Sequence, residues 1–215
     1  MAISADESCI ICMRSFRFRL GVCLMFLLWL GLIAGGYAWS LRYGFATGKA
    51  LEAPLVLPSS LGLPSPLPRA QLFLALHPHC PCSRATVAEL AKIISQTADS
   101  RDITVLMYKP ASQPDSWLNG SLLDDCRRMN CRIRPDPDGL LAASLGGFTS
   151  GNVVLYDVNG KLRYQGGITA SRGHEGDNLG ELAVVEAIHG RGLRLQSLPV
   201  FGCAIQPEGK IKKDP

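Results

Sequence analysis

The chain has 215 residues, which is enough for one domain of ordinary size and an additional segment. Its formal net charge is +4, and it contains no run of five or more Lys or Arg residues, so nothing in it predicts binding to nucleic acid. The eight cysteines are scattered over the whole chain, which argues against a small disulfide scaffold. We expect one reactive cysteine pair among cysteines of mixed role.

Residues 20–39, LGVCLMFLLWLGLIAGGYAW, form an uncharged segment of 20 residues. A helix of this length spans the hydrocarbon core of a bilayer. Three arginines lie within the six residues before it, and only Arg42 and Lys49 follow it within ten residues. This asymmetry predicts a cytoplasmic tail over 1–19, an anchor in the lipid bilayer over 20–39, and everything beyond on the outer side.

A cleaved signal peptide is the alternative interpretation of the same segment. Gly36 and Ala38 offer small residues at the positions that a signal peptidase requires. The apolar stretch is longer than that of most signal peptides, which favours the retained anchor. Either interpretation places the rest of the protein outside the cytoplasm, in the periplasm if a bacterial cytoplasmic membrane holds the anchor.

A Pro-rich linker is predicted over 40–69, because residues 50–70 contain five prolines and almost no charge. Proline fixes φ and removes hydrogen-bond donors, so this linker should form an extended, semi-rigid spacer. We expect one domain over 70–205, followed by a disordered tail over 206–215.

The pattern beyond the linker alternates between strand and helix signals. In chain order it predicts a strand over 71–76, a helix over 83–98, a strand over 102–108, a helix over 115–129, a hairpin of 152–156 and 161–164, and a helix over 179–189. This order predicts an α/β fold, a three-layer domain with a central mixed sheet. It is the order of the thioredoxin fold.

The motif HPHCPCS, residues 77–83, lies between the first predicted strand and the first predicted helix. Pro81 suits the first position of a helix, which makes Cys80 the N-cap and places Cys82 in the first turn, where its sulfur should be less exposed. Free backbone N–H groups and the helix dipole stabilise a thiolate at such a place, and the thiolate is the nucleophile. Arg84 adds positive charge, so the motif predicts disulfide exchange.

Two other interpretations of this motif remain open. The cysteines could be incidental structural residues. Alternatively, His77, His79, Cys80 and Cys82 supply two imidazoles and two thiols within six residues, a soft ligand set that suits Cu(I) or Zn²⁺.

The glycine-rich segment 166–178 leads into the last predicted helix. It could be a plain surface loop that ends in Asn178 as the N-cap. Alternatively it forms a wall of the active site with Arg172 and His174 near the thiols, where His174 could shuttle protons or serve as a further metal ligand.

Three cysteines lie outside the motif in the predicted domain. Cys126 and Cys131 are predicted to form a structural disulfide, because the domain is expected in an oxidising compartment. Cys203 has two interpretations, a buried apolar residue or a distant resolving thiol if the end of the chain folds back.

The motifs HPHCPCS at 77–83, GGITASRGHEGDN at 166–178 and PVFGC at 199–203 resemble the RedB-like branch of the thioredoxin superfamily, which are membrane-associated bacterial proteins. The resemblance covers about residues 70–205 and implies a thioredoxin-like domain. Two features depart from the family. The chain has Cys-x-Cys in place of Cys-x-x-Cys, and Gly151 stands near the position of the family's cis-proline.

These observations predict a membrane-anchored thiol–disulfide oxidoreductase that acts on protein thiols or disulfides and requires no cofactor. Cys80 would attack and Cys82 would resolve the mixed disulfide, with Pro81, Arg84, Gly151, Arg172 and His174 as possible walls of the site. The alternative is a copper-binding or copper-delivery module that uses His77, Cys80, Cys82 and His174. A third possibility is a redox-inactive scaffold that binds a partner.

Overall fold

The computed structural model describes residues 5–97, 100–191 and 196–205. It divides into two compact units, one that ends at Tyr43 and one that begins at Gly44. The predicted tail over 206–215 lies outside the described residues.

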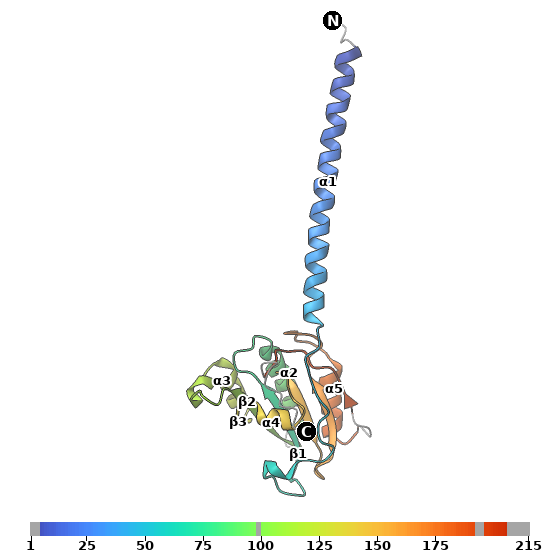
Figure 1. Ribbon diagram of the computed structural model, residues 1–215. Coiled ribbons are helices and arrows are strands. Elements are labelled where there is room, and N and C mark those ends of the chain that lie inside the picture. The colour runs from blue at the N-terminus through green and yellow to red at the C-terminus, as the bar shows by residue number, and fades with distance from the viewer. Residues whose placement is uncertain (1–4, 98–99, 192–195, 206–215) are drawn as a thin grey trace, which may run out of the picture. The chain divides into compact units, whose positions relative to one another are not determined.

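The second unit alternates strands and helices along the chain (Figure 1). Its strands are β1 (Ala70–Leu76), β2 (Arg101–Lys109), β3 (Arg132–Pro137), β4 (Asn152–Tyr156), β5 (Leu162–Gly167) and β6 (Gln196–Ser197). Its α-helices are α2 (Ser83–Thr97), α3 (Ser121–Arg128), α4 (Leu140–Ser144) and α5 (Leu179–Ile188). The short 3₁₀ helices η1 (Ser59–Leu61) and η3 (Asp115–Leu118) complete the described elements.

The sheet has six strands in the order β3-β2-β1-β4-β5-β6. β1 pairs with β2 in parallel and with β4 in antiparallel orientation, and β4 and β5 form an antiparallel hairpin. The parallel unit β1–α2–β2, the hairpin β4–β5 and the final helix α5 follow one another in the order that the sequence predicts. The predicted fold class, an α/β domain with a central mixed sheet, is therefore confirmed.

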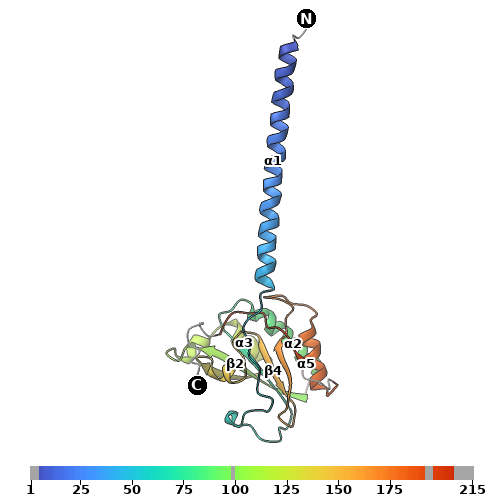
Figure 2. The same cartoon turned by 45° about the vertical axis from the view of Figure 1, so that its right-hand side comes forward.

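Two apolar layers cover the sheet, which explains why all seven residues of β1 are buried. On one face α2, α3 and α5 pack against the strands, as Figure 2 also shows for α2 and α5. Residues of that layer include Leu74, Leu90, Val105, Leu123 and Val184. The opposite face buries Phe73, Ala75, Val154 and Tyr156 under α4 and residues from the segment before β1.

The segment 44–69 belongs to the second unit and differs from the spacer that its composition predicts. Leu51 N donates to Gly146 O (2.9 Å), Leu57 N to Gly160 O (2.8 Å) and Ala53 N to Gln165 Oε1 (2.7 Å). Because α4 has only five residues, much of the second apolar face needs another cover. The uncharged, Pro-rich segment supplies that cover in an extended conformation, so the domain begins at Gly44 instead of residue 70.

Most predicted elements of the domain are present, with differences at the less regular ones. The predicted helix over 115–129 is two pieces, η3 and α3, because Asn119 and Gly120 are extended. The turn of the β4–β5 hairpin forms as predicted: Asp157 Oδ1 accepts bonds from Asn159 N (2.9 Å) and Lys161 N (3.0 Å). β3, α4 and β6 were not predicted.

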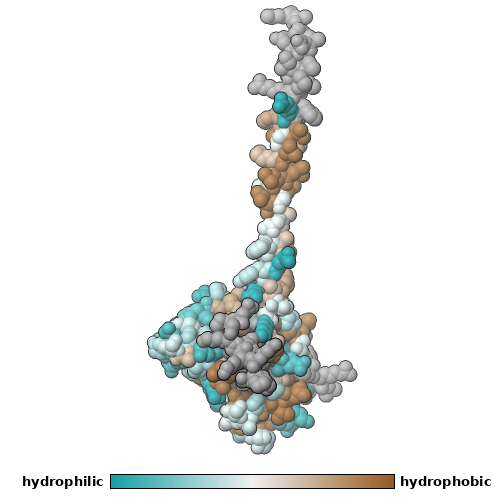
Figure 3. Space-filling view, viewed as in Figure 1, coloured by the Kyte–Doolittle hydropathy of each residue, from teal (hydrophilic) through white to brown (hydrophobic). Residues whose placement is uncertain are grey.

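The helix α1 spans Ala5–Gly44, and all of it except Gly44 belongs to the first unit. Its stretch Arg17–Gly44 is long and apolar enough to cross a membrane, and none of it is buried. Figure 3 shows apolar side chains along the middle of this helix and hydrophilic residues toward the ends of its described part. The predicted segment 20–39 therefore lies inside a single helix.

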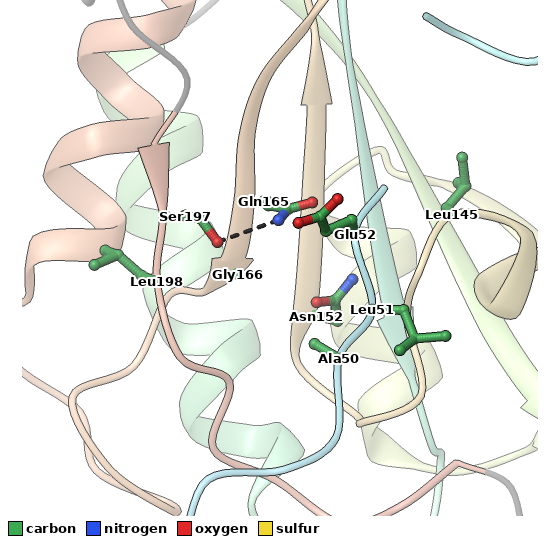
Figure 4. Close-up of a pocket in the computed structure, with 9 residues that line it drawn as sticks. All are labelled: Ala50, Leu51, Glu52, Leu145, Asn152, Gln165, Gly166, Ser197 and Leu198. Carbon is green, nitrogen blue, oxygen red and sulfur yellow. Dashed lines mark hydrogen bonds between the residues drawn. The ribbon is translucent and has the colours of Figure 1, made fainter. Parts of the chain in front are cut away.

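A cavity of about 240 Å³ opens between residues 50–52 and the strands β4 and β5 (Figure 4). Gln165 lies beside it and donates from Nε2 to Ser197 Oγ over 3.2 Å. Its lining residues are Ala50, Leu51, Glu52, Leu145, Asn152, Gln165, Gly166, Ser197 and Leu198. None of them is a cysteine or a histidine, so the cavity is separate from the thiol chemistry.

Candidate thiol site

The regular part of α2 begins at Ser83, so Cys80, Pro81 and Cys82 lie in the turn before the helix and not at the predicted N-cap and first-turn positions. Ser83 N donates to Cys80 O (3.1 Å) and Arg84 N to Pro81 O (3.4 Å), so a tight turn precedes the regular helix that begins at Ser83. Pro81 and Arg84 are exposed on this turn.

Three sulfurs meet at this helix start. The Sγ atoms of Cys80, Cys82 and Cys203 all lie within 4.8 Å of one another, and those of Cys80 and Cys203 are 2.8 Å apart. Cys80 is buried with 6% exposed, whereas Cys82 and Cys203 are partly exposed. The expectation that Cys82 is the less exposed of the motif's two cysteines is wrong, because Cys82 lies in the open turn while Cys203 covers Cys80.

The surroundings separate the three thiols by pKa. Burial alone would raise the pKa of Cys80, but hydrogen bonds from Cys203, Ser83 and the Cys82 N–H outweigh it and lower the pKa. Burial and the charge of Cys80 raise the pKa of Cys82. Burial and the hydrogen bond to Cys80 raise the pKa of Cys203 to about 12. Either Cys80 or Cys203 could donate the hydrogen bond between their sulfurs. Because the pKa of Cys80 is lowered and that of Cys203 is raised, the proton stays on Cys203 and Cys80 carries the negative charge.

Ser150, which the sequence did not single out, joins the segments that carry these sulfurs. Its buried Oγ accepts a bond from His77 N (2.9 Å) and lies 2.8 Å from Ser83 Oγ. Its backbone N donates to Cys203 O over 2.8 Å. No local pattern could have identified this serine, because its partners lie at least 53 residues away along the chain (203 − 150).

Gly151 stands in the same loop, beside the end of β1. Its φ is +96°, and its N–H donates to Ala75 O over 2.8 Å. Proline could adopt neither this φ nor this hydrogen bond. A side chain would also meet Thr86 Oγ1 at 3.0 Å from Cβ. The loop is therefore built on glycine where the resemblance would place a cis-proline.

The segment that carries Cys203 is held across this loop. Ile205 N donates to Phe148 O over 2.9 Å, and Thr149 and Ala204 form a β-bridge. A Cβ at Gly202 would overlap the carbonyl oxygen of Ser150, so only glycine permits the close approach. Of the two interpretations of Cys203, the structure favours the chain end that folds back to the reactive thiols.

The glycine-rich segment lies next to Cys82, as the wall interpretation requires. A Cβ at Gly173 would be 4.0 Å from Cys82 Cα. The positive charge of Arg172 opposes the increases in pKa at Cys82 and Cys203. Arg172 is also tied to the start of the domain, because its backbone N donates to Gly44 O over 3.0 Å.

Glu89 of α2 holds the other end of this segment, and the sequence did not single it out. Its side chain is fully buried and accepts bonds from Gly176 N (2.8 Å) and Asn178 Nδ2 (3.2 Å). Asn178 also caps α5 as predicted, with Oδ1 accepting from Glu181 N over 2.8 Å. The segment is thus positioned from α2 and from α5.

The histidines predicted as metal ligands take other roles. The His77 ring stacks on Tyr108 at 5.1 Å between centroids, and the His79 ring meets Trp117 edge to face at 4.4 Å. Burial and, after it, the charge of His79 lower the pKa of His77.

His174 is exposed. Within the described residues, the group that could hold a metal consists of Cys80, Cys82 and Cys203 alone. The predicted metal-binding set of His77, His79, Cys80, Cys82 and His174 is therefore not assembled. The rings of His77 and His79 pack against Tyr108 and Trp117 instead.

Cys126 and Cys131 lie elsewhere, at the end of α3 and before β3, and both are free thiols in the structure. Cys126 is fully buried, and burial raises its pKa to about 12 and that of Cys131 to about 11. Both thiols are protonated at neutral pH. The disulfide between them stays a prediction.

No protein-family model and no curated protein matches the chain. Two solved structures cover 77% of it: an uncharacterized conserved protein from Geobacillus kaustophilus (14% identity, TM-score 0.53, 95% of that chain) and a hypothetical protein from Sinorhizobium meliloti (17%, 0.52, 97%). A secreted Mycobacterium tuberculosis disulfide oxidoreductase homologous to E. coli DsbE matches more weakly, at 11% identity and TM-score 0.39 over 57% of this chain and 81% of that one. Likeness at these identities concerns the fold alone.

Proposed function

We propose that the chain is a thiol–disulfide oxidoreductase whose reactive thiolate is Cys80. The carrying observation is the cluster of three sulfurs at the turn before α2, where Cys80 Sγ lies 2.8 Å from Cys203 Sγ and hydrogen bonds lower the pKa of Cys80. A thiolate with a neighbouring thiol within bonding reach is what disulfide exchange requires. Protein thiols and disulfides are the substrates, and no cofactor takes part.

The reaction begins when the Cys80 thiolate attacks a substrate disulfide and forms a mixed disulfide. A second thiol of the cluster, Cys82 in the sequence prediction, then attacks Cys80 and releases the substrate as a dithiol. The reverse sequence oxidises a substrate dithiol.

The membrane part of the proposal rests on α1 and on the charges around it. The helix anchors the protein in the bacterial cytoplasmic membrane with the N-terminus in the cytoplasm, and the domain acts in the periplasm. The excess of arginine before residue 20 supports this orientation. The resemblance of the short motifs to those of the RedB-like branch supports the same assignment.

The test of the proposed function is insulin reduction by the full-length protein in detergent, with dithiothreitol as electron donor. Cys80→Ser should abolish the reduction above the dithiothreitol background, because the other two thiols have raised pKa values. Cys23→Ser removes an exposed thiol of α1 and should leave the rate unchanged. Equal rates for Cys80→Ser and the unchanged protein would refute the proposal.

Copper binding is a second candidate, because three sulfurs within 4.8 Å of one another are soft ligands that select Cu(I). This site would use Cys80, Cys82 and Cys203 in place of the predicted histidines. The close pair would have to separate to admit a metal. Titration of the reduced protein with Cu(I) against a competing chelator tests it, and binding that survives Cys203→Ser would contradict a three-sulfur site.

A further inference from the structure

The third sulfur of the site lies at a fixed position. Cys203 is 123 residues away from Cys80 in the chain, yet backbone hydrogen bonds on both sides hold it there. Ser150 N bonds to the Cys203 carbonyl, and Ile205 N bonds to Phe148 O. The requirement for glycine at 202 adds a steric constraint. The contact between the two sulfurs is therefore a product of the fold.

Cys203 is the better geometric partner for a disulfide with Cys80. Their sulfurs are 2.8 Å apart, so they need to approach by less than about 1 Å to reach the bonded distance. A bond between Cys80 and Cys82 closes a very small ring, and such a ring strains the disulfide and makes it readily reduced. Cys203 comes from a separate segment, so no such ring forms.

We propose, on the basis of the proposed function, that Cys203 is the resolving thiol and that the oxidised protein carries a Cys80–Cys203 disulfide. The Cys80 thiolate attacks a substrate disulfide, and the displaced substrate sulfur takes up a proton. Cys203 then loses its proton and attacks Cys80, which breaks the bond to the second substrate sulfur. Two electrons pass to the substrate, and two thiols of this chain become one disulfide.

Peptide mapping of the full-length protein tests this assignment without any variant. The protein is oxidised with diamide, its free thiols are alkylated at acidic pH, and it is digested with trypsin under non-reducing conditions. Trypsin places Cys80 and Cys82 in peptide 70–84 and Cys203 in peptide 195–210. We expect these two peptides to be joined, and to separate on reduction. A disulfide inside 70–84 with Cys203 alkylated would overturn the assignment.

Variants identify which cysteine of the motif is joined. The link should persist in Cys82→Ser and disappear in Cys80→Ser. With insulin as substrate, Cys203→Ser should accumulate a mixed disulfide through Cys80, whereas the Cys23→Ser control should not. Cys203→Ala repeats the test if the serine variant does not fold.

Failure of this inference differs from failure of the proposed function. If insulin is reduced at the same rate with and without Cys203, and no disulfide to Cys203 forms, the proposed function stands but Cys203 is not the resolving thiol. If the protein neither reduces insulin nor forms a disulfide at Cys80, both the proposed function and this inference are wrong.

Discussion

Single residues decide how close the reactive segments come to one another. Cys80 and Cys82 follow from the local motif, because a proline between two cysteines after an apolar strand indicates a helix start. Ser150, Gly202 and Cys203 join the site through contacts between distant segments. The sequence leaves two interpretations open for Cys203, a buried apolar residue or a resolving thiol, and it contains no signal for Ser150.

The close approach at Gly202 leads to a prediction. Gly202→Ala places a Cβ against the Ser150 carbonyl oxygen and should displace the segment that carries Cys203. We expect the Cys80–Cys203 link to be lost and the unfolding free energy to fall by about 1–3 kcal/mol, as for overpacked sites. Urea unfolding and peptide mapping measure the two effects.

The matched control for this variant is Ala204→Ser, a change at an exposed position two residues further along. It should leave both the link and the stability as they are. If Gly202→Ala forms the link with the same yield as the unchanged protein, the glycine does not position Cys203.

At the scale of elements, the regular parts of the domain were predictable and the irregular ones were not. The hairpin β4–β5 has a strong local signal in Asn159-Gly160, and β1 has one in its continuous apolar run. By contrast, β3 reads RIRPDP, with two prolines and two arginines, and it pairs at the sheet edge with only β2. Its pairing depends on tertiary contact, so composition alone argues against a strand there.

The connection between α2 and the glycine-rich segment gives a second prediction. Glu89→Gln keeps the shape of the side chain but removes the charge that accepts bonds from Gly176 N and Asn178 Nδ2. We expect a loss of about 1–3 kcal/mol in unfolding free energy, because one of the two acceptor oxygens becomes an NH₂ group that cannot accept a hydrogen bond. Faster alkylation of Cys82 should accompany it, since Gly173 borders that residue.

Lys92→Ala is the control, because it removes the ion pair of 3.0 Å with Glu89 but leaves both bonds to the segment in place. Lys92→Ala should therefore leave the alkylation rate of Cys82 unchanged. An equal change in alkylation for both variants would mean that Glu89 does not position the segment.

The disulfide predicted between Cys126 and Cys131, at the end of α3, leads to a third testable prediction. If Cys126 and Cys131 are bonded in the exported protein, reduction should lower the melting temperature, by an amount that corresponds to about 2 kcal/mol for so short a loop. Replacing both with Ser should leave insulin reduction intact. Mass spectrometry that finds both as free thiols in protein isolated from the periplasm would contradict the bond.

At the scale of the whole molecule, the Pro-rich segment is part of the domain and not a spacer. Its composition predicts a spacer, but the apolar face of β1 and β4 needs a cover, and Ala53, Leu61 and Leu67 are buried. Within the domain, Arg172 N donates to Gly44 O over 3.0 Å, so the packed segment extends back to Gly44.

This arrangement predicts how the protein responds to protease. In spheroplasts, the domain should be accessible from outside, and cleavage between 44 and 69 should be slow because that segment is bonded to the domain. Immunoblotting of the domain after limited proteolysis measures both. Protection of the whole domain until lysis would contradict the orientation, and rapid cleavage within 44–69 would contradict the packed segment.

The most direct test of the central claim is the pH dependence of alkylation of each thiol in the reduced, full-length protein, followed by mass spectrometry. Because its pKa is lowered, Cys80 should become a thiolate, and react, at a lower pH than an ordinary cysteine with a pKa of about 8.5. Cys82 should require a higher pH than Cys80, and Cys203 should stay unmodified at neutral pH. Modification of Cys82 before Cys80 would contradict the assignment of Cys80 as the attacking thiolate.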